Sequence, residues 1–158
     1  MTHPTLDAFP VRTAEKLRFA DTDQHGHVTN ALFAVCFQNA RLEVLRERGI
    51  PPADGMVILA RLDIYFLSEL HWPGEVIVGT RADRIGRASL QLAQAVFSGG
   101  RCCAKATSTC VLIDRASRRS MPWPDHAIEA LHALVPTGLP LECDERAFLL
   151  PPQAAVAR

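Results

Sequence analysis

The chain lacks an excess of charge of either sign: its 158 residues contain 17 lysines and arginines against 17 aspartates and glutamates. Proteins that bind nucleic acids usually carry a basic surplus, and disordered acidic tails carry the opposite one. We therefore expect no nucleic-acid partner, and any charged ligand must be held by a local cluster of side chains.

Long uncharged apolar runs are also missing. No stretch of about 18 residues is free of charge, as a membrane-spanning helix would require. Residues 1–20 contain several charged side chains and no apolar segment of signal-peptide length. The sequence therefore predicts neither membrane insertion nor export.

Cysteine is too scarce for a disulfide framework. The 5 cysteines are odd in number and fall largely on apolar faces, which favours reduced thiols in a reducing compartment such as the cytoplasm. Neighbouring residues on a strand point to opposite faces, so Cys102 and Cys103 are not expected to form a redox pair. A glycine-rich phosphate loop and a serine nucleophile elbow are absent as well.

Apolar residues, by contrast, are abundant enough for one core. They make up 48% of the chain, which suits one compact domain. We expect a single domain over residues 1–158, with a core at about 12–135, a leader at 1–11 and an irregular tail at 136–158.

The most regular segment is 31–48, where apolar residues recur at helical spacing. Thr29 or Asn30 is expected to cap this helix, and Gly49 followed by prolines to end it. Arg41 is assigned to the polar side. The predicted buried face comprises Phe33, Cys36, Phe37, Ala40 and Val44, widened by Leu32, Val35 and Leu45.

Strands are predicted before and after this helix in the sequence. The expected strands are 12–20, 56–67, 75–84, 89–97 and 102–114, and a short second helix covers 124–134. The segment 56–67 is apolar enough to be covered on both faces, and a phase change within 89–97 indicates a bulge. One strand, a long helix and four consecutive antiparallel strands predict an α+β architecture, an antiparallel sheet of about five strands wrapped around a long central helix. This order of elements resembles that of a hotdog fold.

Two acids and two histidines gather just before the helix, in Arg-Phe-Ala-Asp-Thr-Asp-Gln-His-Gly-His-Val-Thr-Asn at 18–30. This segment resembles the D-x-D-x-x-G-H-V-N-N signature of hotdog acyl-CoA thioesterases of the 4-hydroxybenzoyl-CoA thioesterase type, with Thr29 where asparagine is common. The resemblance extends over roughly residues 12–135, and Ser68 stands where a basic residue is often found. It implies hydrolysis of an acyl-CoA to a free acid and coenzyme A, with no separate cofactor.

The resemblance assigns the catalytic carboxylate to Asp23, as nucleophile on the thioester carbonyl or as base for the attacking water. The residues themselves point to a compatible site, because the backbone N–H groups of Asn30 and Ala31 at the helix start are suited to hold an oxyanion. Gly26 permits the tight turn that brings acid and donors together. The substrate-binding residues predicted in this loop are His25, Gly26, His27 and Val28.

Contacts to the phosphates of coenzyme A are placed by the resemblance at Arg87 and Ser89, on a predicted hairpin turn. An arginine guanidinium suits phosphate oxygens. A solvated turn arginine is the alternative interpretation and stays open at this point.

Other acidic and basic residues receive structural interpretations. Asp21 is expected to bond loop N–H groups, with a supporting catalytic role left open. His25 and His27 lack the helical or knuckle spacing of tetrahedral ligands, so no metal site is predicted. Glu43 is interpreted as a surface or interface charge.

A sheet of this kind leaves an edge and an apolar flank exposed, so we expect at least a homodimer, with continuous sheets and the pocket between subunits. The resemblance implies a dimer or a tetramer made of dimers. Two alternative functions remain: a sensor that binds acyl-CoA without hydrolysing it, and a dehydratase or hydratase, which needs a histidine and acid motif that is not found. The aromatic candidates for an acyl pocket, or for plain core, are Phe33, Phe37, Trp72 and Phe97.

Overall fold

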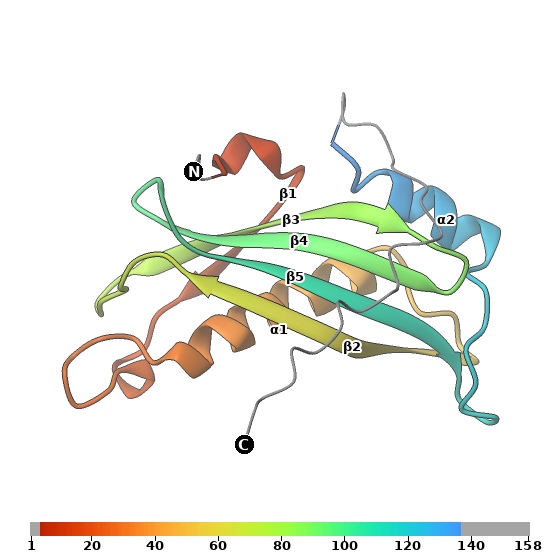
Figure 1. The fold of residues 1–158 in the computed structure, drawn as a ribbon, viewed down its shortest axis with the longest axis horizontal. Coiled ribbons are helices and arrows are strands. Elements are labelled where there is room, and N and C mark those ends of the chain that lie inside the picture. The colour runs from red at the N-terminus through yellow and green to blue at the C-terminus, as the bar shows by residue number, and fades with distance from the viewer. Residues whose placement is uncertain (1–3, 137–158) are drawn as a thin grey trace, which may run out of the picture.

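The computed structural model describes residues 4–136 as a five-stranded antiparallel sheet with one long helix lying along one face (Figure 1). This is the α+β hotdog arrangement that the sequence predicts. The elements in chain order are η1 (Leu6–Ala8), β1 (Val11–Lys16), η2 (Phe19–Asp21), α1 (Asn30–Glu47), β2 (Gly55–Phe66), β3 (Glu75–Ile85), β4 (Ser89–Ser98), β5 (Arg101–Asp114) and α2 (Asp125–His132).

The strands are arranged in the order β1-β3-β4-β5-β2. β3, β4 and β5 form the predicted meander, but β2 pairs with β5 at the far edge instead of lying beside β3. The prediction that this strand is covered on both faces is wrong for the single chain, because Leu59, Tyr65 and Phe66 are 43%, 59% and 49% exposed. An apolar run does not distinguish a central strand from an edge strand.

β4 keeps one alternation along its whole length: Leu90, Leu92, Gln94 and Val96 lie on the α1 face, and Ala95 and Phe97 are buried on the other face against Phe9. Bulges lie instead in the two neighbouring strands. Asp83 of β3 is the extra residue where the pairing shifts between Ala82 and Arg84. Cys103 of β5 is the extra residue opposite Val96 and Phe97. The bulge predicted within 89–97 is therefore wrong, because the extra residues belong to β3 and β5.

α1 begins after Thr29 and ends in the predicted glycine cap. Gly49 has a φ of +66°, and the N–H of Ile50 donates a 2.9 Å bond back to the carbonyl of Leu45. Arg41 is buried, against the prediction, because it lies four residues after Phe37 and four before Leu45 and shares their face. The predicted residues that are buried are Phe33, Cys36, Phe37, Ala40, Val44 and Leu45, whereas Val35 is exposed.

A buried polar layer crosses the space between α1 and the sheet. The side-chain amide of Gln94 donates to the carbonyl of Phe37 at 3.0 Å and to the hydroxyl of Thr80 at 3.1 Å. Burial lowers the pKa of the Arg41 guanidinium, whose Nη1 has no hydrogen-bond partner within residues 4–136. Apolar clusters lie on both sides of this layer, and the cluster around Phe33 supports the loop described below.

The leader contributes to the core, which therefore begins before residue 12. Phe9 is 3% exposed, and its ring packs edge-to-face on Phe97 with centroids 5.8 Å apart. Nearly all of the predicted tail lies outside the described residues, so a single domain over 1–158 stays a prediction. Within 4–136, no helix has the length and apolar character needed to cross a membrane.

Candidate active site

The segment between η2 and α1 is a loop that is closed by backbone hydrogen bonds between its own residues. The N–H of Asp23 donates a 2.8 Å bond to the carbonyl of His27, and the N–H of Gly26 donates a 3.1 Å bond to the carbonyl of Asp23. Gly26 has a φ of +78°, and a Cβ there would meet nothing within 4 Å. Backbone conformation, not space, therefore requires the glycine, as the sequence predicts.

The carboxylate of Asp23 is held by two bonds within this loop. Its Oδ1 accepts from the N–H of His25 at 2.8 Å and from the N–H of His27 at 3.1 Å. These bonds, chiefly the one from His25, lower the pKa of Asp23 below its ordinary value. The carboxylate is therefore ionised at neutral pH, and both of these bonds go to Oδ1.

Two backbone N–H groups just before α1 already have hydrogen-bond acceptors outside the helix. The N–H of Val28 donates to the carbonyl of Leu70 and that of Thr29 to the carbonyl of Asp21, both at 2.9 Å. Thr29 is the N-cap residue, one of the two that were predicted, but its side chain makes no capping bond. The first turn of a helix has no internal partners for its N–H groups. The donors available here are consequently those of Asn30 and Ala31.

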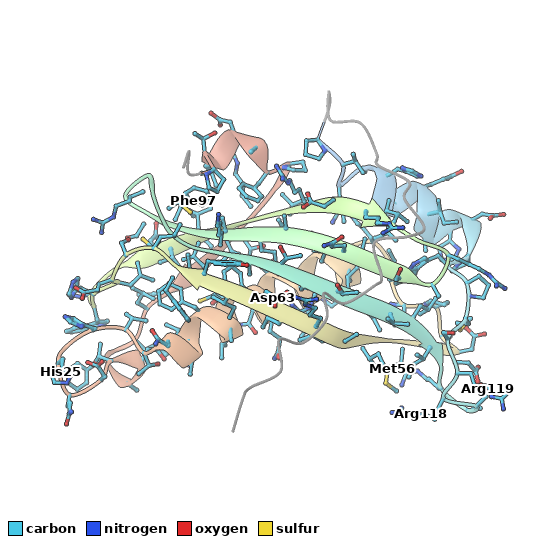
Figure 2. The ribbon with its side chains drawn as sticks, in the orientation of Figure 1. His25, Met56, Asp63, Phe97, Arg118 and Arg119 are labelled. Carbon is cyan, nitrogen blue, oxygen red and sulfur yellow. The ribbon has the colours of Figure 1, made fainter. Side chains whose placement is uncertain are left out.

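A hollow of about 440 Å³ opens beside Asp23 and the start of α1. It is lined by Asp23, His27, Val28, Thr29, Asn30, Phe33, Phe66, Ser68 and Glu69. The predicted residues Asp23, His27, Val28 and Asn30 therefore come together, whereas His25, Gly26 and Ala31 are not part of the lining. Figure 2 shows His25 at the outer end of the loop.

An aromatic pair forms one wall of the hollow. Phe33 of α1 and Phe66 of β2 meet edge-to-face with centroids 5.4 Å apart. Phe33 is 3% exposed and Phe66 49%. Of the other aromatic candidates, Phe37 and Phe97 are core residues, and Trp72 is exposed against Phe19.

Ser68 and Glu69 are residues of the hollow that the sequence motif does not identify. They follow the end of β2, and the pairing of β2 with β5 carries them to the site; the N–H of Ser68 donates a 3.0 Å bond to the carbonyl of Cys103. The hydroxyl oxygen of Ser68 is buried and has no partner within the described part of the chain. A buried polar atom without a partner is uncommon in folded proteins, so this hydroxyl is a notable feature of the wall of the hollow.

His27 meets a second histidine that the motif also leaves unmarked. Nε2 of His27 lies 3.6 Å from Oε2 of Glu69, and Nε2 of His71 lies 3.8 Å from the same oxygen. The backbones of His27 and His71 form an isolated antiparallel bridge. His25 instead points its Nε2 to within 3.3 Å of the Gln24 amide. The sequence analysis considered His25 together with His27, but in the structure His27 is paired with His71.

Asp21 has the structural role expected of it. Its Oδ2 accepts a 2.8 Å bond from the N–H of Arg18, and its carbonyl accepts the bond from Thr29. Glu43, on the partly exposed side of α1, does not line the hollow.

Arg87 and Ser89 lie away from the hollow within one chain. The N–H of Trp123 donates a 2.9 Å bond to the carbonyl of Arg87, and its indole N–H donates a 3.2 Å bond to the carbonyl of Ser89. Figure 1 shows the β3–β4 turn at the opposite end of the sheet from the loop that precedes α1. The single chain does not bring these residues to Asp23.

Buried thiols do not supply an alternative nucleophile. Burial raises the pKa of Cys36 to about 12, with Glu15 and Asp21 adding to the effect. Burial also raises the pKa of Cys102 and of Cys110. These groups stay protonated at neutral pH, and all four cysteines within residues 4–136 are free, as predicted.

Solved structures similar to this chain include proteins named as thioesterases. Among solved structures, a Pseudomonas aeruginosa protein is 26% identical, with a TM-score of 0.78 over 85% of this chain and 97% of that one. A Thermus thermophilus thioesterase, solved with coenzyme A and zinc, is 31% identical, with a TM-score of 0.70 over 80% and 95%. A predicted thioesterase from Bacillus stearothermophilus is 26% identical, with a TM-score of 0.72 over 78% and 95%.

No curated protein matches the sequence. The family model of the thioesterase-like superfamily, however, matches residues 17–131, which include the whole Asp23 loop, α1 and the sheet from β2 to β5. The family expected from the sequence motif is thereby confirmed at the level of thioesterases. The chain belongs to the thioesterase-like superfamily.

Proposed function

We propose that the protein hydrolyses an acyl-CoA thioester to the free carboxylic acid and coenzyme A. The observation that carries this proposal is the hollow in which the ionised carboxylate of Asp23 and the start of α1 at Asn30 face the same space. Membership of the thioesterase-like superfamily and the coenzyme A in the Thermus thermophilus structure support the same substrate class.

In the proposed mechanism, the thioester carbonyl oxygen accepts from the N–H groups of Asn30 and Ala31, next to the positive end of the α1 dipole. Asp23 then acts in one of two ways. It attacks the carbonyl carbon, so that the C–S bond breaks to give an anhydride that water hydrolyses, or it takes a proton from water that attacks the same carbon. Either route ends with a carboxylic acid and a protonated coenzyme A thiol.

The acyl group is proposed to lie against the aromatic wall of Phe33 and Phe66. These rings provide an apolar surface next to the carboxylate, and the unpaired hydroxyl of Ser68 provides a hydrogen-bonding group on the same side. This combination suits an apolar acyl chain or ring with its polar carbonyl at the mouth of the hollow.

The proposed assembly is a homodimer in which β2 pairs with β2 of a second copy. β2 is an edge strand with an exposed apolar surface, a combination that soluble proteins usually cover. Antiparallel pairing across a two-fold axis reverses the second sheet. The partner's β3–β4 turn would then lie at the same end as this chain's Asp23 loop, which is how Arg87 and Ser89 are proposed to reach coenzyme A.

The test is thiol release from short, long and aromatic acyl-CoAs, followed with a chromogenic thiol reagent, beside calorimetric binding of free coenzyme A. Hydrolysis of any member of the panel well above the buffer rate is the expected result. Binding without thiol release would overturn hydrolysis and favour the sensor. Neither binding nor release would overturn the substrate class.

A further inference from the structure

We propose that His27, Glu69 and His71 form a binding site for one divalent transition-metal ion of the zinc class, at the rim of the hollow. The ligand atoms of these three residues all lie within 4.8 Å of one another. The inference concerns metal binding alone and does not rest on the proposed hydrolysis.

The spacing of the ligand atoms is close to what a tetrahedral ion needs. Zinc bonds to imidazole nitrogen and carboxylate oxygen are about 2.0–2.2 Å long, which places neighbouring ligands of a tetrahedron about 3.3–3.6 Å apart. The two distances to Oε2 of Glu69 are 3.6 Å from His27 and 3.8 Å from His71. Small side-chain rotations would therefore bring all three ligands onto one ion.

Backbone pairing holds His27 and His71 opposite one another. His27 and His71 are bridge partners, and the next N–H along the loop, that of Val28, donates to the carbonyl of Leu70. Their rings meet at 80° with centroids 5.0 Å apart. Two segments that are distant in sequence therefore present their imidazoles side by side to one carboxylate.

The ligand set selects the class of ion. Imidazole nitrogens suit zinc, cobalt, nickel and copper ions, whereas magnesium and calcium prefer oxygen ligands. The side chains of His27, His71 and Glu69 are 37%, 58% and 66% exposed, so an ion in solution can reach them. Three protein ligands leave one position for water or another small ligand.

The experiment uses tag-free full-length protein that has been treated with a chelator and then equilibrated with zinc, cobalt or magnesium chloride. Bound metal is measured by mass spectrometry after buffer exchange, affinity by calorimetry, and coordination by the visible absorption of cobalt. His71→Ala and Glu69→Gln remove single ligands at exposed positions. His25→Ala, in the same loop, and His132→Ala, on α2, are the matched controls, and circular dichroism checks the folding of each variant.

The expected result is one zinc ion per chain, a tetrahedral cobalt spectrum and no retained magnesium. Affinity should fall at least about 100-fold in His71→Ala and in Glu69→Gln, because loss of a ligand should cost no less than loss of an outer-shell partner. The two controls should bind as the wild type does. A wild type that retains no zinc, a His71→Ala variant with unchanged affinity, or an equal loss in His25→Ala would each overturn the site.

Discussion

Asp23 and His27 are joined by a reciprocal pair of hydrogen bonds. The backbone N–H of Asp23 donates to the carbonyl of His27 at 2.8 Å, and the N–H of His27 returns a 3.1 Å bond to Oδ1 of the Asp23 carboxylate. This closure fixes the acid relative to the start of α1 before any substrate arrives. The carboxylate that we propose to react is thus positioned by backbone geometry.

The acidic limb of the pH profile should lie unusually low. The loop N–H bonds lower the pKa of Asp23, so its catalytically competent carboxylate persists as pH falls. We expect kcat/KM to stay level as pH falls from neutral and to decline only below the ordinary aspartate pKa of about 3.9. Rates measured at constant ionic strength check this. A limb centred near 6.5, the ordinary pKa of histidine, would assign the base to an imidazole instead.

Arg87→Ala should weaken recognition of coenzyme A and leave the chemistry intact. Losing a guanidinium contact to phosphate is expected to raise KM for an acyl-CoA about tenfold, with kcat nearly constant. The same variant should hydrolyse a truncated thioester without the nucleotide phosphates as the wild type does. Arg119→Ala is the control, since Figure 2 places Arg119 at the same end of the molecule on another turn. An equal KM change on both substrates would contradict a phosphate contact.

Leu59→Lys should separate the proposed dimer. Leu59 is 43% exposed on the edge strand β2, and a lysine there would place two like charges near the two-fold axis. Sedimentation velocity should show a dimer for the wild type and a concentration-dependent shift to monomer for the variant. Ala14→Lys, on β1 at the opposite edge, should remain dimeric. A monomeric wild type would disprove the assembly.

Gly79→Ala should destabilise the fold. An ideal Cβ at Gly79 would lie 2.6 Å from Cγ of Phe9, so the leader must shift, at a cost of about 1–3 kcal/mol. At Gly74 the nearest atom would be 3.7 Å away, so Gly74→Ala is the matched control. Urea unfolding measures both. The loss of unfolding free energy caused by Gly79→Ala should be smaller in a Phe9→Ala background. An undiminished loss in that background would point to a cause other than this contact.

Local patterns were sufficient for most of the fold and for the centre of the site. Helical spacing predicted α1 to within one residue at each end, and Gly49 marked its end because only a left-handed residue continues the chain there. The motif around Asp23 predicted the turn at Gly26 for a similar reason. These features depend on neighbours in sequence, which a pattern records.

Features that depend on distant pairing were not predictable in the same way. The position of β2 beside β5 follows from the path of the chain around α1, and the hollow acquires Ser68 and Glu69 only through that pairing. His71 joins His27 through a bridge between segments more than forty positions apart in the sequence. The burial of Arg41 is a different case. The sequence analysis assigned Arg41 to the polar side of the helix, although its spacing of four residues from Phe37 places it on the buried face.

The central claim is tested most directly by Asp23→Asn beside Asp21→Asn in thiol-release assays. An asparagine at either position can still accept the backbone hydrogen bonds, so the loop should fold in both variants. Asp23→Asn should lower kcat at least about 100-fold, because the nucleophile or base is lost, whereas Asp21→Asn should retain most of the activity. Turnover by Asp23→Asn within about threefold of the wild type would contradict the assignment of Asp23 as the reacting carboxylate.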